Sequence, residues 1–176
     1  MEYVILVDER DKPLGLMEKL EAHQKGELHR ALSVLIFNPQ GQLLLQQRAQ
    51  GKYHSPALWT NTCCTHPRDG EDIREAGKRR LLEEMGMSEE LEPLFQFTYK
   101  ADFSNGLVEH EYDHVLVGRS NELPKLNPEE AMDFEFMSLP DIRDEINKKP
   151  EQFTPWFRIL IGEHFETLNR FACGLQ

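Results

Sequence analysis

Apolar residues occur in short runs along this chain, and most of these runs predict strands. The segment 3–8 is expected to be a first strand, and the runs 31–37 and 42–46 flank the sequence Asn38-Pro39-Gln40-Gly41. Two apolar runs around a turn of this composition predict a β-hairpin. Further strands are expected at 58–63, 94–103, 107–119 and 134–137, and the second and third of these should pair around a turn at 102–106.

Three segments predict helices. The charged segment 69–85 is followed by Gly86, a residue typical of helix C-caps. Ser138 is placed to cap a second helix that carries Pro140 in its first turn, and a last helix should span about 154–169. Strands mixed with a few helices predict an α+β fold, arranged as a mixed α/β/α sandwich.

Composition and charge narrow the class of protein. The chain has 176 residues and no linker-like segment, so we expect a single domain over 1–176. No apolar run approaches the ~20 residues needed to span a bilayer, and no basic region precedes the first apolar stretch. Three cysteines, two of them adjacent, do not form a secreted disulfide framework. We therefore expect a cytoplasmic protein without membrane association.

The formal net charge of −11 argues against a general nucleic-acid surface. The same charge would repel a phosphorylated substrate on average. Any anionic ligand must therefore be held by local lysine and arginine side chains or by a metal ion.

One stretch of the chain places a thiol and an imidazole next to a cluster of carboxylates. Asn61-Thr62-Cys63-Cys64-Thr65-His66-Pro67 lies shortly before the charged segment 79–87, which reads RRLLEEMGM. This charged segment resembles the Nudix box. Aligned on its end, the match covers Glu71, Arg79, Leu81, Glu83, Glu84, Gly86 and Met87, whereas Thr65 and Arg80 stand where the box has Gly and Glu.

A box altered in this way and preceded by Asn-x-x-Cys-x-His-Pro resembles the type I isopentenyl diphosphate isomerases. Four further segments match that family in order: Glu18 to His23 with His29, 47–52, 109–111 and 154–156. The resemblance implies a Nudix-type fold and a small-molecule prenyl diphosphate substrate. It also implies that the protein interconverts isopentenyl diphosphate and dimethylallyl diphosphate in isoprenoid biosynthesis.

A group of histidines and glutamates is a candidate metal site. Alternate side chains of a strand share a face, so Glu109 and Glu111 should lie roughly 7 Å apart on one side. A pair of glutamates at this spacing most often lies on a solvated face of a strand. Imidazole and carboxylate groups together, however, suit zinc, manganese or magnesium. The resemblance implies that His23, His29 and His66 join the two glutamates around one divalent ion, whose identity is open. The other histidines match no motif and are expected to be structural: His54, His110, His114 and His164.

A second group is a candidate site for the diphosphate. Arg80 and Glu84 are four residues apart and share one side of a helix, where an ordinary surface ion pair would also explain them. A fixed cation in place of a box carboxylate favours holding a diphosphate over cutting it. The resemblance assigns Glu84 to a Mg²⁺ bound through the diphosphate, and magnesium suits one carboxylate plus phosphate oxygens. It assigns the anion contacts to Lys19, Arg48, Lys52 and Arg80.

Moving a double bond requires an acid against a weakly basic alkene and stabilisation of the resulting tertiary cation. The resemblance implies that Cys64 is the catalytic thiol and Glu111 the acid/base carboxylate. It makes Tyr99 and Trp156 the aromatic walls of the alkene pocket, and Trp156 can offer its π face to a cation. The ordinary role of a cysteine is a small buried side chain. We assign that role to Cys63, because consecutive strand residues face opposite ways.

Two other functions remain open. The first is a Nudix hydrolase that cuts a nucleoside or prenyl diphosphate, against which the altered box positions and the Cys-x-His motif count. The second is a non-catalytic binding or regulatory module, against which the retention of every candidate acid, base and ligand counts. The oligomeric state is open.

Overall fold

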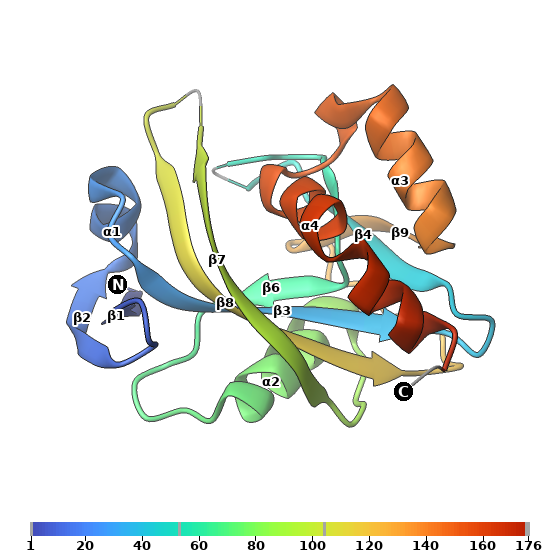
Figure 1. The fold of residues 1–176 in the computed structure, drawn as a ribbon, viewed down its shortest axis with the longest axis horizontal. Helices are drawn as coiled ribbons and strands as arrows, with labels where there is room; N and C mark the ends of the chain where they lie inside the picture. Colours follow the sequence, from blue (N-terminus) through green and yellow to red (C-terminus); the bar gives the residue numbers. More distant parts are fainter. Residues whose placement is uncertain (1, 53, 104, 175–176) are drawn as a thin grey trace.

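The computed structural model describes residues 2–52, 54–103 and 105–174. Within these ranges one mixed sheet is covered by helices on both faces (Figure 1). In chain order the elements are β1 (Tyr3–Val7), β2 (Pro13–Glu18), α1 (Lys19–Lys25), β3 (His29–Phe37), β4 (Leu43–Arg48), β5 (Trp59–Thr60), β6 (Cys63–Thr65), α2 (Ile73–Met85), β7 (Glu92–Asp102), β8 (Val108–Arg119), β9 (Ala131–Met137), α3 (Leu139–Lys148), the 3₁₀ helix η1 (Pro150–Gln152) and α4 (Pro155–Ala172).

Strand β3 is the centre of the sheet. It pairs in parallel with β8 along its whole length, from His29 opposite Glu111 to Phe37 opposite Arg119. It also pairs antiparallel with β6, where Ser33 lies opposite Cys64. Strand β8 pairs on its other side with β7, and β4 pairs with β9. Segments distant in sequence therefore meet in neighbouring strands.

The alternation of side chains along β3 builds two cores. Val34 points into one core with α2, whereas Leu35 points into the other with α4. Figure 1 shows α2 on one side of the sheet and α3 and α4 on the other. The α/β/α sandwich expected from the sequence is confirmed.

Helix α2 carries the box-like segment and begins later than the sequence predicts. The Asp72 side chain accepts the backbone N–H groups of Arg74 at 2.9 Å and Glu75 at 3.3 Å, which makes it the N-cap. The helix ends as expected at Gly86, whose φ of 63° is left-handed. A Cβ there would lie 2.6 Å from the Lys125 carbonyl oxygen, so glycine is required.

The expected hairpin is wrong in its extent. Strands β3 and β4 share one paired position, Phe37 with Leu43, and then diverge. The reason is that β3 is apolar on both faces and is buried between β8 and β6. The expected strand 58–63 is divided into β5 and β6, and Ser104 in the expected turn 102–106 lies outside the described residues.

Two N-terminal elements were not anticipated. Strand β2 is largely exposed and pairs with β1, and α1 is a seven-residue helix. The Glu18 side chain caps α1 by accepting the Glu21 N–H, and Gly26 ends it with a φ of 67°. In the described part of the chain no helix combines the length and apolar character that crossing a bilayer requires.

Candidate active site

A cavity of about 900 Å³ opens between α1, α2, α4 and the sheet. It gathers side chains from nearly every segment that the sequence singled out. Lining it are Lys19, His23, Arg48, Lys52, Cys64, His66, Arg80, Glu84, Tyr99, Glu109, Glu111 and Trp156. Of the predicted site residues, His29 alone is not part of this lining, and it is fully buried.

Strand β8 places three acidic side chains on one face. Glu109, Glu111 and Asp113 occupy alternate positions, and all three are buried. The parallel register sets His29 of β3 beside Glu111. Burial alone disfavours a charge at any of these positions, so an ionised member of the row needs a specific partner.

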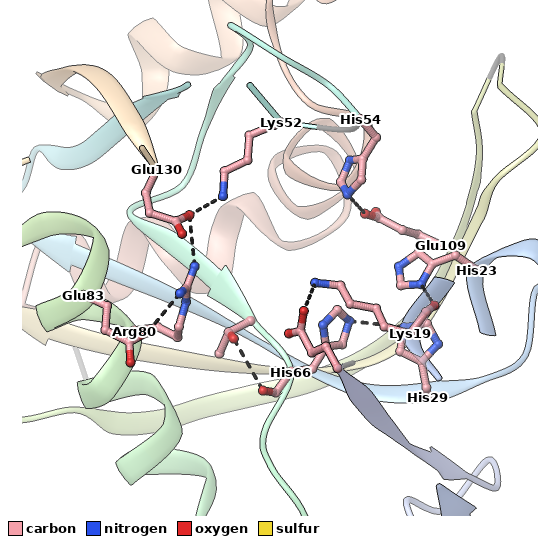
Figure 2. A network of polar contacts seen from close by, with 12 residues as sticks. Lys19, His23, His29, Lys52, His54, His66, Arg80, Glu83, Glu109 and Glu130 are labelled. Carbon is pink, nitrogen blue, oxygen red and sulfur yellow. Dashed lines mark hydrogen bonds and ion pairs between the residues drawn. The ribbon is translucent and has the colours of Figure 1, made fainter. Parts of the chain in front are cut away.

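Three imidazoles converge on Glu111. The ligand atoms of His23, His29, His66 and Glu111 all lie within 4.8 Å of one another. His66 Nε2 is 3.1 Å from Glu111 Oε1, and His29 Nε2 is 3.2 Å from His66 Nε2. Figure 2 shows the three rings turned toward one another.

Backbone carbonyls orient two of these rings. His23 Nδ1 is 2.7 Å from the Lys19 carbonyl oxygen, and His29 Nδ1 is 2.8 Å from that of Glu27. A carbonyl can only accept, so each Nδ1 carries a hydrogen and Nε2 is the nitrogen left to face the cluster. This is the arrangement by which a protein fixes metal-binding imidazoles, and the donor set fits a divalent ion.

The charges of the cluster also suit a cation. Burial lowers the pKa of His23 and lowers that of His66 to about 4, so both imidazoles are neutral near neutral pH. Burial would raise the pKa of Glu111, but hydrogen bonds with His29 and His66 outweigh it and hold the pKa well below the usual range. Neutral imidazoles and an ionised carboxylate are the forms that bind metal.

Glu109 lies beside this cluster and is not one of its four converging members. Burial and the charge of Glu111 raise its pKa well above the usual range. The Tyr99 hydroxyl is 2.6 Å from Glu111 Oε2 and 3.1 Å from Glu109 Oε2, and it can donate its single hydrogen to one of them. Glu109 therefore keeps its proton more readily than Glu111 does.

The thiol of Cys64 faces the cavity. Its Sγ donates to Asn61 Oδ1 at 3.2 Å, and Ser33 Oγ lies 4.0 Å away. Burial, and then the nearby Asp113, raise the pKa of this thiol, so it is neutral. Cys63 points into the α2 core and is fully buried, as the alternation of strand residues predicts.

The aromatic residues expected around the substrate also lie here. Trp156 is 5% exposed, and the Arg48 guanidinium lies 5.2 Å from its ring centroid. Arg48 is held in turn by the carbonyl oxygens of Ser55 and His54, to which it donates at 3.1 and 3.2 Å. One face of Trp156 thus already holds a cation.

Basic side chains of the cavity lining are paired with carboxylates. Arg80 donates to Glu84 Oε1 at 2.5 Å, as the helical spacing predicts, and Gln46 donates to Glu84 Oε2 at 2.7 Å. Burial raises the pKa of Glu84, although the Arg80 charge opposes the shift. Lys19 forms an ion pair of 3.1 Å with Glu2 at the cavity edge.

Three residues of the site were missed by sequence reasoning. Asp113 continues the alternation of Glu109 and Glu111, so the strand period could have identified it. His54 lies 3.8 Å from Glu109, and burial and then the Arg48 charge lower its pKa to about 3. Glu130 reaches Lys52 and Arg80 from the segment before β9. His54 and Glu130 belong to loops, and no local pattern marks them.

Comparisons with known proteins agree with this fold. Residues 27–157 match the NUDIX domain family. A crystal structure of a Deinococcus radiodurans protein has a TM-score of 0.76 at 22% identity and covers 92% of this chain and 98% of its own. A MutT protein from Methanosarcina mazei has a TM-score of 0.65 at 19% identity, over 82% and 94% of the two chains. The fold is that of the NUDIX class.

Closer relatives define the family within that class. A Pectobacterium atrosepticum protein named isopentenyl-diphosphate Delta-isomerase is 54% identical over 89% of this chain and 87% of its own. A Burkholderia multivorans protein with the same name is 45% identical over 97% of this chain and 98% of its own. The chain belongs to the isopentenyl-diphosphate Delta-isomerase family.

Proposed function

We propose that this protein interconverts isopentenyl diphosphate and dimethylallyl diphosphate, a step of isoprenoid biosynthesis. The observation that carries the proposal is that Cys64 and Glu111 line one cavity together with the basic side chains Lys19, Arg48, Lys52 and Arg80. The reaction needs two proton-transfer groups near a five-carbon unit and an anchor for the diphosphate. This cavity offers both.

Cys64 and Glu111 are suited to exchange protons with the alkene. The neutral thiol can donate a proton, and the ionised carboxylate can accept one. In one direction a proton is added to the terminal carbon of the double bond and another is removed from the carbon two positions away. The reverse direction exchanges the two roles.

His23, His29, His66 and Glu111 would hold one divalent ion, and Glu109 lies next to them. Such an ion supplies positive charge that tunes the acidity of Glu111. Whether manganese, zinc or magnesium occupies the site is a matter for metal analysis. The described residues themselves fix the imidazole rings and hold Glu111 in its ionised form.

The diphosphate is proposed to bind through the basic side chains of the lining, Lys19, Arg48, Lys52 and Arg80. Glu84 would contact the Mg²⁺ that accompanies the diphosphate. Tyr99 and Trp156 would flank the five-carbon unit, and the Trp156 π system favours positive charge developing there. The single domain over 1–176 and the cytoplasmic location stay predictions.

The test is proton NMR of isopentenyl diphosphate incubated with the protein and magnesium in deuterated water. We expect dimethylallyl diphosphate that carries solvent deuterium, with no phosphate released. A hydrolase would release phosphate and leave the carbon skeleton unlabelled. Phosphate without deuterated product would overturn the proposal.

A further inference from the structure

Glu130 bridges Lys52 and Arg80, two cations of the cavity lining. Its Oε2 accepts from Lys52 Nζ in a short ion pair and from Arg80 NH2 at 3.1 Å. Lys52 follows β4, Arg80 lies on α2, and Glu130 immediately precedes β9. Figure 2 shows the Glu130 carboxylate between the side chains of Lys52 and Arg80. A bound phosphate group would present its oxygens to these same cations.

Backbone hydrogen bonds also hold the loop of Glu130 in place. Backbone bonds already tie the loop to the end of α2, where Lys125 N–H donates to the Met85 carbonyl at 2.7 Å and Asn127 N–H to that of Glu84 at 2.9 Å. The Glu130 carbonyl accepts from Ala49 N–H at 3.0 Å. The loop therefore has backbone anchors besides the ion pairs of the Glu130 side chain.

The charges around Arg80 oppose a bare anion. Arg80 contacts Glu83 at 2.9 Å and Glu84 at 2.5 Å in addition to Glu130. Glu83 is also paired with Arg79, whose second partner is Glu71. The network thus holds three cations (Lys52, Arg79, Arg80) and four carboxylates (Glu71, Glu83, Glu84, Glu130), which leaves one net negative charge (three minus four). Burial would raise the pKa of Glu130, but Lys52 and then Arg80 outweigh it and hold the carboxyl ionised.

We propose that Glu130 is an internal counter-anion that occupies the place of a phosphate group. This inference rests on the proposed function of the site. The carboxylate competes with metal-free diphosphate for Lys52 and Arg80. A divalent ion that arrives with the diphosphate compensates the negative charges of Glu84 and Glu130, so the site accepts the metal complex and rejects the free anion. Glu130 is thus a specificity residue for the form of the ligand.

The perturbation is Glu130→Gln, which keeps the shape of the side chain and removes its charge. The matched control is Glu129→Gln, which removes the same charge from the adjacent, exposed position. Calorimetry measures the binding of inorganic diphosphate to metal-depleted protein, first without magnesium and then with saturating magnesium. Urea unfolding of each variant verifies that it is folded.

We expect Glu130→Gln to bind metal-free diphosphate about 10-fold or more tightly than the unmodified protein, since a nearby partly buried charge is lost. With magnesium the gain should shrink or reverse, and Glu129→Gln should follow the unmodified protein throughout. Unchanged or weaker metal-free binding by Glu130→Gln would refute the counter-anion role, as would a variant that fails to fold. Glu130→Ala repeats the test without a polar side chain.

The experiment separates this inference from the function on which it rests. If the unmodified protein binds the magnesium complex and Glu130→Gln shows no metal-free gain, the inference alone fails. If the unmodified protein binds diphosphate under neither condition, the assignment of Lys52 and Arg80 to diphosphate binding fails, and the inference fails with it.

Discussion

Replacing Asp113 by asparagine should stabilise the protein increasingly as the pH rises. Asp113 is 2% exposed, and Ser33 Oγ donates to its Oδ2 at 2.8 Å. Its Oδ1 has no hydrogen-bond partner within the described residues. Burial, and then the charge of Glu111, raise the pKa of Asp113 from 3.8 to about 8.

The sign follows from proton counting. Between pH 3.8 and about 8 the folded protein keeps a proton on Asp113 that the unfolded chain has lost. Its contribution to stability is therefore complete below pH 3.8 and is lost as the pH rises through about 8. The loss is about 1.4 kcal/mol per pH unit, or at most about 4 kcal/mol near neutral pH. Asparagine carries no titratable proton and escapes this loss.

The assay is urea unfolding of metal-depleted protein at several pH values. The free energy of unfolding of Asp113→Asn, relative to the unmodified protein, should rise by about 3–4 kcal/mol between about pH 5 and about pH 8. Asp144→Asn, at an exposed position of α3, should show no comparable trend. A difference that does not vary with pH would show that the folded Asp113 is ionised, and the reasoning would be refuted.

Further outcomes test the proposed roles of the site. Cys64→Ala should fold and lose several orders of magnitude of isomerase activity in the NMR assay. Cys63→Ala should keep most of the activity, because Cys63 faces the core with α2. The opposite pattern would show that the assignment of Cys64, and not Cys63, to the cavity is wrong. Chelation should abolish activity. Elemental analysis should find that His23→Ala lowers the content of tightly bound divalent metal far more than His164→Ala does. Equal losses in the two variants would show that His23 is not a metal ligand. Calorimetry should show that Trp156→Leu weakens the binding of an ammonium analogue of the carbocation by about 1–2 kcal/mol more than it weakens the binding of substrate. Equal effects on the two ligands would exclude a cation–π role for Trp156.

The local geometry of the site follows from the sequence. The period of a strand correctly separates Cys63 from Cys64 and places Glu109 with Glu111. The period of a helix correctly pairs Arg80 with Glu84. These relations depend on residues that are close in the chain, where backbone geometry alone fixes which side chains share a face.

The long-range pairing could not be predicted in the same way. The runs around Asn38 indicate a hairpin, yet β3 pairs along its length with β8, more than seventy residues away. Tertiary burial on both faces decides this pairing, and no local signal records it. The presence of His54 and Glu130 in the site could not be predicted for a related reason. Both lie in loops, and the positions of loop side chains depend on the elements that the loops connect.

The parallel ladder between β3 and β8 makes the site sensitive to changes of chain length. A single residue inserted in β8 between Asp113 and Val115 would force either a bulge or a slip of the strand. A slip would turn Glu109, Glu111 and Asp113 to the other face of the sheet and would turn His110 and Tyr112 toward the cavity. A substitution can therefore change one side chain of the site and leave the others in place. Insertions and deletions are tolerable only in the loops that surround the site.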